Sequence, residues 1–203
     1  MRVILTLFMS LFLAGAAVAE ADMNQVLKTE QRGLKAMKPT RLSGLLQEPP
    51  SKLSYSSKWL SSLPKASGGA EWRCLSEALY FEARGESVKG QFAVAEVILN
   101  RVDSARFPGS VCDVINQGTG RKYACQFTYT CDGHKEVIAE PKAFQRVAKV
   151  AKLMLSGAPR ELTGGATYYH TNAVRPRWSR KFARTTTIGV HHFYRHPSKI
   201  AMN

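Results

Sequence analysis

The sequence predicts an α+β fold, mainly α, arranged as a single domain with a small β-hairpin. Three stretches carry apolar residues at steps of three and four, the spacing of one helical face. Two short runs near the C-terminus are expected to form strands, the second because its residues alternate with the period of a strand. The length of 203 residues and the hydrophobic content of 44% suffice for one ordinary core with processed or flexible ends.

Residues 1–19 have the pattern of a secretory signal peptide, in which Arg2 precedes an apolar run and Ala17-Val18-Ala19. The apolar run is too short for a comfortable membrane span, so we favour cleavage after Ala19 over an uncleaved anchor. The pattern predicts export across the inner membrane and no stable membrane span after cleavage.

Residues 20–68 are rich in Ser, Pro, Lys and Gly and show no sustained period, which is typical of a flexible linker or tether. Their first part is expected to form at most a weak helix, and the pair Trp59-Leu60 could dock onto the domain. We expect this segment to tether the domain or to reach an envelope protein partner. The domain itself is placed at residues 69–203.

The first helical stretch places Trp72, Leu75 and Leu79 on one face. Glu82 is the next position of that face, so a carboxylate stands where the pattern asks for a core residue. Burying an unpaired carboxylate is costly unless it keeps its proton, and a carboxyl that is protonated near neutral pH can act as a general acid. The alternative is that Glu82 lies just past the last helical turn and is solvated.

A second helix is expected after a turn, with Gly85 as the helix stop and Ser87 as the next cap. Its apolar face is formed by Val88, Phe92, Ala95, Leu99 and Val102. Such a buried helix directly after Glu82 and Glu86 would hold both carboxylates in a rigid frame, as catalytic groups require.

The remaining elements are shorter or less regular. A loop-rich region covers residues 106–134, and a third helix is expected over residues 141–156, with Gly157 as its stop. The two expected strands are residues 166–171 and 187–194.

The four cysteines are Cys74, Cys112, Cys125 and Cys131. An even number in an exported chain indicates two disulfides. We favour Cys125 with Cys131, because they bracket a short loop, and therefore Cys74 with Cys112. No Cys-x-x-Cys pair is present and the histidines lack the usual ligand spacing, so we expect no metal site and no cofactor.

The basic charge is unevenly placed in this chain of formal net charge +14. From Leu162 to Asn203 there are seven Lys or Arg and no Asp or Glu. Five of these cations surround Trp178: Arg175, Arg177, Arg180, Lys181 and Arg184. Such a cluster attracts anions, and in an exported protein we favour wall peptide carboxylates or an anionic membrane over nucleic acid. The alternative is a solvated basic face that aids solubility.

Four groups of motifs carry a resemblance to a known family. They are residues 78–86 (ALYFEARGE) with 90–102, residues 125–128 (CQFT), residues 165–170 (GATYYH), and Trp178 with residues 188–194 (IGVHHFY). In this order they resemble the cell-wall hydrolase family typified by the spore-cortex-lytic enzyme SleB. The likeness extends from Trp72 to Tyr194, and the ordered motifs make it specific.

The resemblance implies a lysozyme-like fold related to lytic transglycosylases. It also implies cleavage of the β-1,4 bond between N-acetylmuramic acid and N-acetylglucosamine in peptidoglycan. The family's catalytic glutamate falls on Glu82, which would protonate the leaving glycosidic oxygen. In the transglycosylase route the substrate's own N-acetyl group and 6-hydroxyl complete the reaction and give a 1,6-anhydro product, whereas a hydrolase needs a second group to place water.

Five further residues are candidates at the site. Glu86 is the candidate second carboxylate, and its structural alternative is a capping or turn-stabilising role at the start of the next helix. Gln126, Tyr168, Tyr169 and Trp178 are candidates for substrate binding. Adjacent residues of a strand face opposite ways, so we expect only one of the two tyrosines to touch sugar. Gln126 could instead bond the loop backbone, and Trp178 could instead fill the core.

Two other functions stay open at this point, a muramidase-type hydrolase that uses Glu86 to place water and a non-catalytic wall-binding module. The chain departs from the spore proteins in its basic N-terminal segment and its four cysteines. These features favour a Gram-negative periplasm and general wall remodelling over spore germination.

Overall fold

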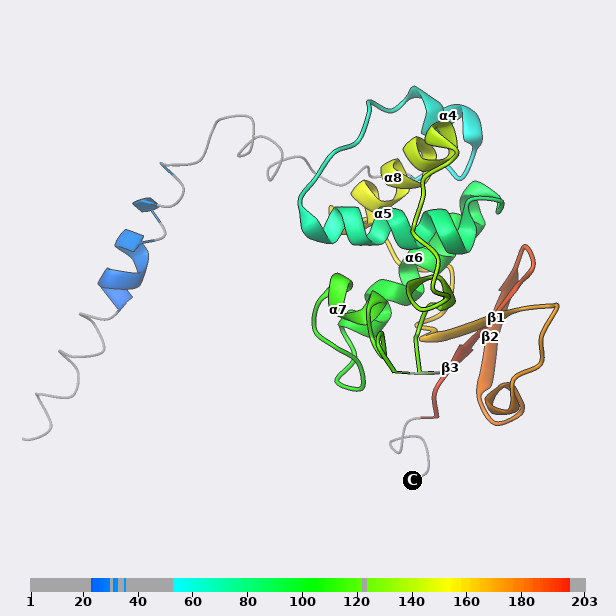
Figure 1. The fold of residues 1–203 in the computed structure, drawn as a ribbon. Helices are drawn as coiled ribbons and strands as arrows, with labels where there is room; N and C mark the ends of the chain where they lie inside the picture. The colour runs from blue at the N-terminus through cyan, green and yellow to red at the C-terminus, as the bar shows by residue number, and fades with distance from the viewer. Residues whose placement is uncertain (1–22, 30, 33–34, 36–52, 122–123, 198–203) are drawn as a thin grey trace, which may run out of the picture. The chain divides into compact units, whose positions relative to one another are not determined.

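The computed structural model describes residues 23–29, 31–32, 35, 53–121 and 124–197 (Figure 1). The chain divides into two compact units, residues 1–48 and residues 49–203. The described residues of the first unit are helical and exposed. The expected signal peptide lies outside the described residues, and among those described no helix is both long and apolar enough to cross a membrane.

The second unit is built mainly of helices. They are α4 (Ser57–Ser62), α5 (Ala70–Ala83), α6 (Val88–Val102), α7 (Val111–Ile115) and α8 (Pro141–Leu155), with the 3-10 turns η1 (Thr128–Thr130) and η2 (Arg177–Arg180). The helices α5, α6 and α8 correspond to the three helices predicted from periodicity. The predicted cap is also present, because the Ser87 hydroxyl accepts a hydrogen bond from the Gly90 amide at 3.1 Å.

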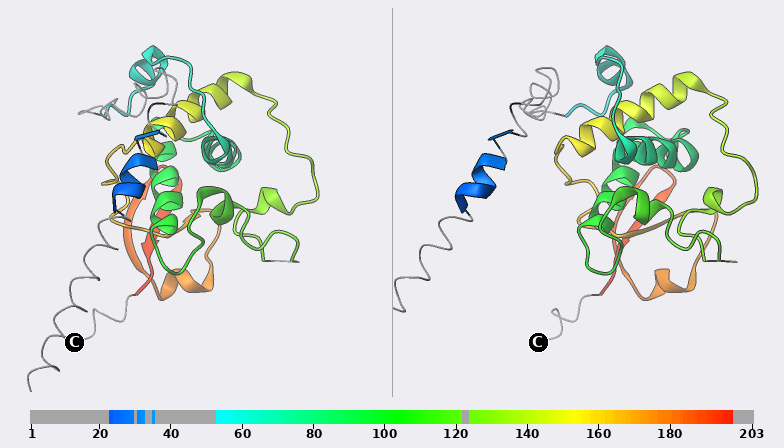
Figure 2. Two further views of the ribbon diagram at one scale, coloured as in Figure 1. Left: turned by 90° about the vertical axis from the view of Figure 1, so that its left-hand side faces the viewer. Right: turned by 60° about the vertical axis from the view of Figure 1, so that its left-hand side comes forward.

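The core lies where the apolar faces of α5, α6 and α8 meet, and α5 also packs against α7. Leu79, Phe92 and Val147 each contribute a side chain that is almost fully buried. The opposite side of α6 packs on the sheet through Ala93 and Val97. The central helix α6 is therefore covered by α8 on one side and by the sheet on the other, as the views in Figure 2 show.

The sheet has three antiparallel strands in the order β1-β3-β2. They are β1 (Tyr168–Thr171), β2 (Ala183–Ile188) and β3 (His191–Arg195). The single strand expected over residues 187–194 is wrong, because a turn with Gly189 at φ +60° separates β2 from β3. The alternation of side chains continues through this turn in the sequence, so the pattern hid both the turn and most of β2.

Residues 53–63 pack onto the other helices of the second unit instead of forming a separate linker. Leu60 of α4 is fully buried, and the Tyr55 ring meets the Phe92 ring edge to face at 5.3 Å. The Lys149 ammonium donates to the Leu60 and Ser61 carbonyls at 3.0 Å. The packed unit thus begins before residue 69, where the sequence placed its boundary.

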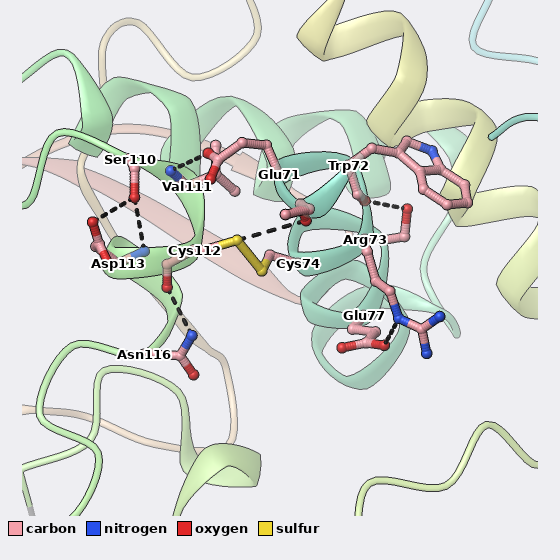
Figure 3. The surroundings of a disulfide bond; sticks show 12 residues. Glu71, Trp72, Arg73, Cys74, Glu77, Ser110, Val111, Cys112, Asp113 and Asn116 are labelled. Carbon is pink, nitrogen blue, oxygen red and sulfur yellow. Dashed lines mark hydrogen bonds and ion pairs between the residues drawn. A yellow bond between two sulfur atoms is a disulfide. The ribbon is translucent and has the colours of Figure 1, made fainter. Parts of the chain in front are cut away.

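The structure contains two disulfides, Cys74–Cys112 and Cys125–Cys131, the pairing favoured from the sequence. The first joins α5 to α7 (Figure 3). Beside it, the Glu71 carboxylate accepts a hydrogen bond from the Val111 amide at 2.6 Å. The start of α7 is thereby held against α5 by one covalent and one polar contact.

Candidate active site

A cleft of about 560 Å³ lies where α5 ends and α6 begins. Its lining includes the carboxylates predicted from the sequence, together with aromatic and basic side chains: Phe81, Glu82, Arg84, Glu86, Gln91 and Arg146. Two carboxylates that are close in sequence thus share one concave surface.

Glu82 lies in the last turn of α5 and is half-buried. The Tyr169 hydroxyl donates a hydrogen bond to its carboxylate at 2.9 Å. Burial raises the pKa of Glu82 above its ordinary value, and it outweighs the lowering by the Tyr169 hydrogen bond and by the positive charge of Arg101. A carboxyl in this setting keeps its proton to higher pH than an exposed one, as a general acid must.

The two tyrosines of β1 face opposite ways, as alternation along a strand requires. Tyr169 meets Glu82, and burial together with the Glu82 charge raises its pKa well above the ordinary value, so its hydroxyl remains a donor. Tyr168 instead packs on the other face, with its ring 5.3 Å from the Trp178 ring and 4.8 Å from the Phe182 ring. None of the four candidate binding residues is among the residues that line the cleft: Gln126, Tyr168, Tyr169 and Trp178.

Trp178, a residue of η2, forms part of an aromatic cluster. Its ring lies 5.3 Å from Tyr194, 5.6 Å from His170 and 5.5 Å from Phe182. The indole has aromatic neighbours on several sides and is half-buried.

The Glu86 carboxylate faces the turn between β2 and β3. One of its oxygens lies 3.4 Å from Nδ1 of the buried His191. A Cβ atom on Gly189 would lie 2.0 Å from the other oxygen, and a Cβ atom on Gly90 would lie 2.9 Å from it. The carboxylate therefore occupies space that is free only because Gly189 and Gly90 have no side chain. The side-chain cap of α6 is made by Ser87, whereas Glu86 lies against the turn between β2 and β3.

Gln126 bonds a buried arginine. With its amide oxygen turned toward Arg101, it accepts hydrogen bonds from both terminal guanidinium nitrogens at 3.2 Å. Arg101 also donates through Nε to the Thr167 carbonyl at 2.7 Å, and its guanidinium lies over the Phe127 and Tyr169 rings. Gln126 thus bonds the same guanidinium whose positive charge acts on Glu82.

Sequence reasoning assigned no role to Arg101 or to Tyr129. Arg101 is buried at the end of α6, and its positive charge acts on Glu82. The sequence signal that could have identified Arg101 is the presence of a charged residue in a helix that is predicted to be mostly buried. Tyr129 stacks on Phe81 at 4.5 Å, and burial and the Glu82 charge raise its pKa. It belongs to the loop closed by Cys125–Cys131, which no periodic pattern describes.

No metal site accompanies these groups in the part of the chain that the structure describes. Within the described ranges, no three His, Cys, Asp or Glu side chains are grouped so that they could hold an ion. Burial lowers the pKa of His191 below its ordinary value, although the neighbouring Glu86 opposes this shift.

The chain belongs to the cell wall hydrolase family, whose sequence profile matches residues 85–194. The mainly helical α+β fold and the family resemblance predicted from the sequence are both confirmed. Among solved structures, the chain is similar to the catalytic domain of the germination-specific lytic transglycosylase SleB from Bacillus anthracis. It is 32% identical, the match covers 66% of this chain and 100% of that chain, and the TM-score is 0.50.

Curated relatives carry the name spore cortex-lytic enzyme. The protein of Halalkalibacterium halodurans is 32% identical over 134 residues, which are 66% of this chain and 37% of the relative. The protein of Bacillus subtilis is 38% identical over 88 residues, which are 43% of this chain and 26% of the relative. The chain thus spans less than half the length of these relatives.

Proposed function

We propose that this protein is a peptidoglycan-cleaving enzyme that breaks the β-1,4 bond between N-acetylmuramic acid and N-acetylglucosamine, with Glu82 as the general acid. The observation that carries the proposal is the half-buried Glu82 carboxyl in a cleft, with a raised pKa and a hydrogen bond from Tyr169. The printed names of the relatives, cortex-lytic enzyme and lytic transglycosylase, support the same reaction class.

In the proposed reaction, the Glu82 proton passes to the glycosidic oxygen while the bond from that oxygen to C1 of N-acetylmuramic acid breaks. The positive charge that develops at C1 is stabilised by the sugar's own N-acetyl group. The 6-hydroxyl then attacks C1 and returns its proton to the Glu82 carboxylate, which gives a 1,6-anhydro end. Between these steps Glu82 is ionised, and the Tyr169 hydroxyl and the Arg101 charge stabilise that form.

A hydrolytic route is the second candidate, and the position of Glu86 favours it. The Glu86 carboxylate lines the same cleft and is held beside His191. A carboxylate so placed can orient a water molecule for attack at C1, which a muramidase-type hydrolase needs. The product then has a reducing end instead of an anhydro end.

Mass spectrometry of the fragments released from purified peptidoglycan distinguishes these routes. We expect 1,6-anhydro ends from the wild type and a loss of roughly 10²- to 10⁴-fold in rate for Glu82→Gln, the usual contribution of a general acid. Fragments with reducing ends are one water heavier than anhydro fragments. Their release by the wild type, together with a similar loss of rate for Glu86→Gln, would show that the enzyme is a hydrolase and not a transglycosylase. If the protein binds the wall but releases no fragment, the result would contradict an enzyme and favour a non-catalytic wall-binding module.

We further propose that the chain works in wall remodelling in the periplasm of a Gram-negative cell. Its two disulfides are suited to an oxidising compartment outside the cytoplasm. The proposed envelope partner of residues 20–68 would bind the part before residue 53, because residues 53–63 are engaged in packing. Fractionation of cells that express the full chain tests the location, and recovery in the cytoplasm would contradict it.

A further inference from the structure

The last part of the described chain presents a surface of exposed cations. We call it the basic surface, and it consists of Arg175, Arg177, Arg180, Lys181, Arg184 and Arg195. These residues come from the segment around η2 and from the adjoining ends of β2 and β3, where Ala183 lies opposite Arg195. Arg184 and Arg195 lie at the end of the sheet where β2 begins, and the other four cations belong to the segment that leads into β2.

Acidic side chains do not balance this charge locally. The sequence holds no Asp or Glu from Leu162 to Asn203. Within the described residues the basic surface makes no ion pair, and its one side-chain hydrogen bond is donated by Arg184 to the Thr187 hydroxyl. Three of the described arginines elsewhere are paired with carboxylates: Arg73 with Glu77, Arg84 with Glu140 and Arg160 with Asp103. A cluster of like charges without local neutralisation attracts anions.

The backbone that carries these cations is well fixed. The amides of Lys181 and Phe182 both donate to the Trp178 carbonyl, at 2.9 and 3.1 Å. The Trp178 ring is in turn packed between Tyr168 and Tyr194 at 5.3 Å from each. Cations on a fixed backbone lose less conformational freedom when they bind than cations on a mobile tail.

The basic surface is connected to the cleft by β2. This strand runs from the basic surface to the turn at Gly189, which adjoins the Glu86 carboxylate. At the usual rise per residue, Arg184 and Gly189 are about 17 Å apart along the strand. The segment around η2 packs on the face of the sheet that carries Tyr168, opposite the face on which Tyr169 meets Glu82, so the basic surface is a separate surface from the cleft.

We propose that the basic surface binds the peptide carboxylates of peptidoglycan, either on the strand that is cleaved or on a neighbouring strand. The stem peptides of the wall carry carboxylates at regular intervals, and guanidinium groups bind carboxylates in a bidentate manner. The choice of peptidoglycan as the polymer rests on the proposed function. The binding does not depend on cleavage, so a variant that cannot cleave still shows it.

Sedimentation with purified peptidoglycan sacculi tests the proposal. All proteins carry Glu82→Gln, so the wall stays intact and binding is measured apart from the reaction. We expect the triple change Arg177→Gln, Arg180→Gln and Lys181→Gln to weaken binding roughly tenfold, since each exposed charge contributes modestly. The matched control removes three exposed cations elsewhere, through Lys65→Gln, Lys135→Gln and Lys152→Gln. It is expected to bind within about twofold of the parent.

Two further arms identify the anion. On sacculi whose stem carboxylates have been amidated, we expect the parent to bind as weakly as the triple variant binds untreated sacculi. Equal loss in the triple variant and its control would overturn the proposal, because net charge alone would then explain binding. The proposal also fails if the triple change abolishes binding to phosphatidylglycerol vesicles but leaves binding to sacculi intact, since the partner is then a membrane.

Discussion

At the scale of single residues, Glu82 is defined by the balance between burial and its polar neighbours. Its pKa is raised, so the folded chain holds this proton more tightly than the unfolded chain does. That contribution to stability is complete below the ordinary glutamate pKa and is lost as the pH rises through the raised value. Near neutral pH, the folded protein is therefore less stable than it would be if Glu82 had an ordinary pKa.

The first prediction concerns this cost. Gln cannot ionise, so Glu82→Gln should become more stable relative to the wild type as the pH is raised from about 4 to about 7. Urea unfolding of both proteins at several pH values measures the difference. Glu136→Gln, which removes an exposed carboxylate, is the control. A difference in unfolding free energy that is flat or falls with pH would contradict a raised pKa at Glu82.

A second prediction concerns the room around Glu86. Gly189→Ala combines a backbone at φ +60° with a Cβ atom 2.0 Å from the Glu86 carboxylate, whereas Gly165→Ala has φ +74° and no neighbour within 4 Å. We expect Gly165→Ala to cost about 1 kcal/mol and Gly189→Ala about 1–3 kcal/mol more, with a loss of activity. In the background of Glu86→Ala this excess should disappear. Equal costs at both glycines would show that Glu86 is not fitted against the turn.

At the scale of elements, periodicity identified α5, α6 and α8, because each places one apolar face in the core. The pattern also marked Glu82, since a carboxylate interrupted the face of Trp72, Leu75 and Leu79. Contacts between distant segments gave no such signal. Tyr169 lies 87 residues from Glu82, and no local pattern joins them.

The elements that were missed have a similar cause. Most of β2 reads as Arg-Thr-Thr-Thr and lacks the apolar alternation that would mark a strand, because its burial is only partial. α4 was assigned to the linker, since its six residues hold a single buried side chain, Leu60. Short elements that depend on tertiary contacts contain too few residues to show a periodic pattern, so periodicity does not predict them.

The third prediction tests whether α4 belongs to the domain. Leu60→Ala removes a fully buried side chain and should cost about 2–5 kcal/mol of unfolding free energy. Leu155→Ala, at a position of α8 that is 37% exposed, should cost less than about 1 kcal/mol. Guanidinium unfolding measures both. Similar small costs would mean that α4 is a loosely attached part of the linker.

At the scale of the whole molecule, the two disulfides close segments of very different length. Cys74 and Cys112 are 38 residues apart and join α5 to α7, whereas Cys125 and Cys131 are 6 residues apart. Cross-linking stabilises a fold mainly by restricting the unfolded chain, and the effect grows with the length of the segment. The longer bridge therefore governs global stability, and the shorter one governs the loop of Tyr129 beside Glu82.

The fourth prediction follows from this difference in scale. In the chain-entropy treatment, replacing both cysteines of Cys74–Cys112 by Ala should cost about 4 kcal/mol, and replacing both of Cys125–Cys131 about 2 kcal/mol. The second pair also frees the loop that stacks Tyr129 on Phe81. We therefore expect its removal to lower wall-cleaving activity more than its smaller stability cost suggests. Thermal unfolding and peptidoglycan release, assayed below the melting temperature of each variant, separate the two effects. A smaller loss of stability for the longer bridge than for the shorter one would contradict the chain-entropy argument. If activity followed stability alone in both pairs, the short loop would have no part in the site, and the chain would require an oxidising compartment for stability only.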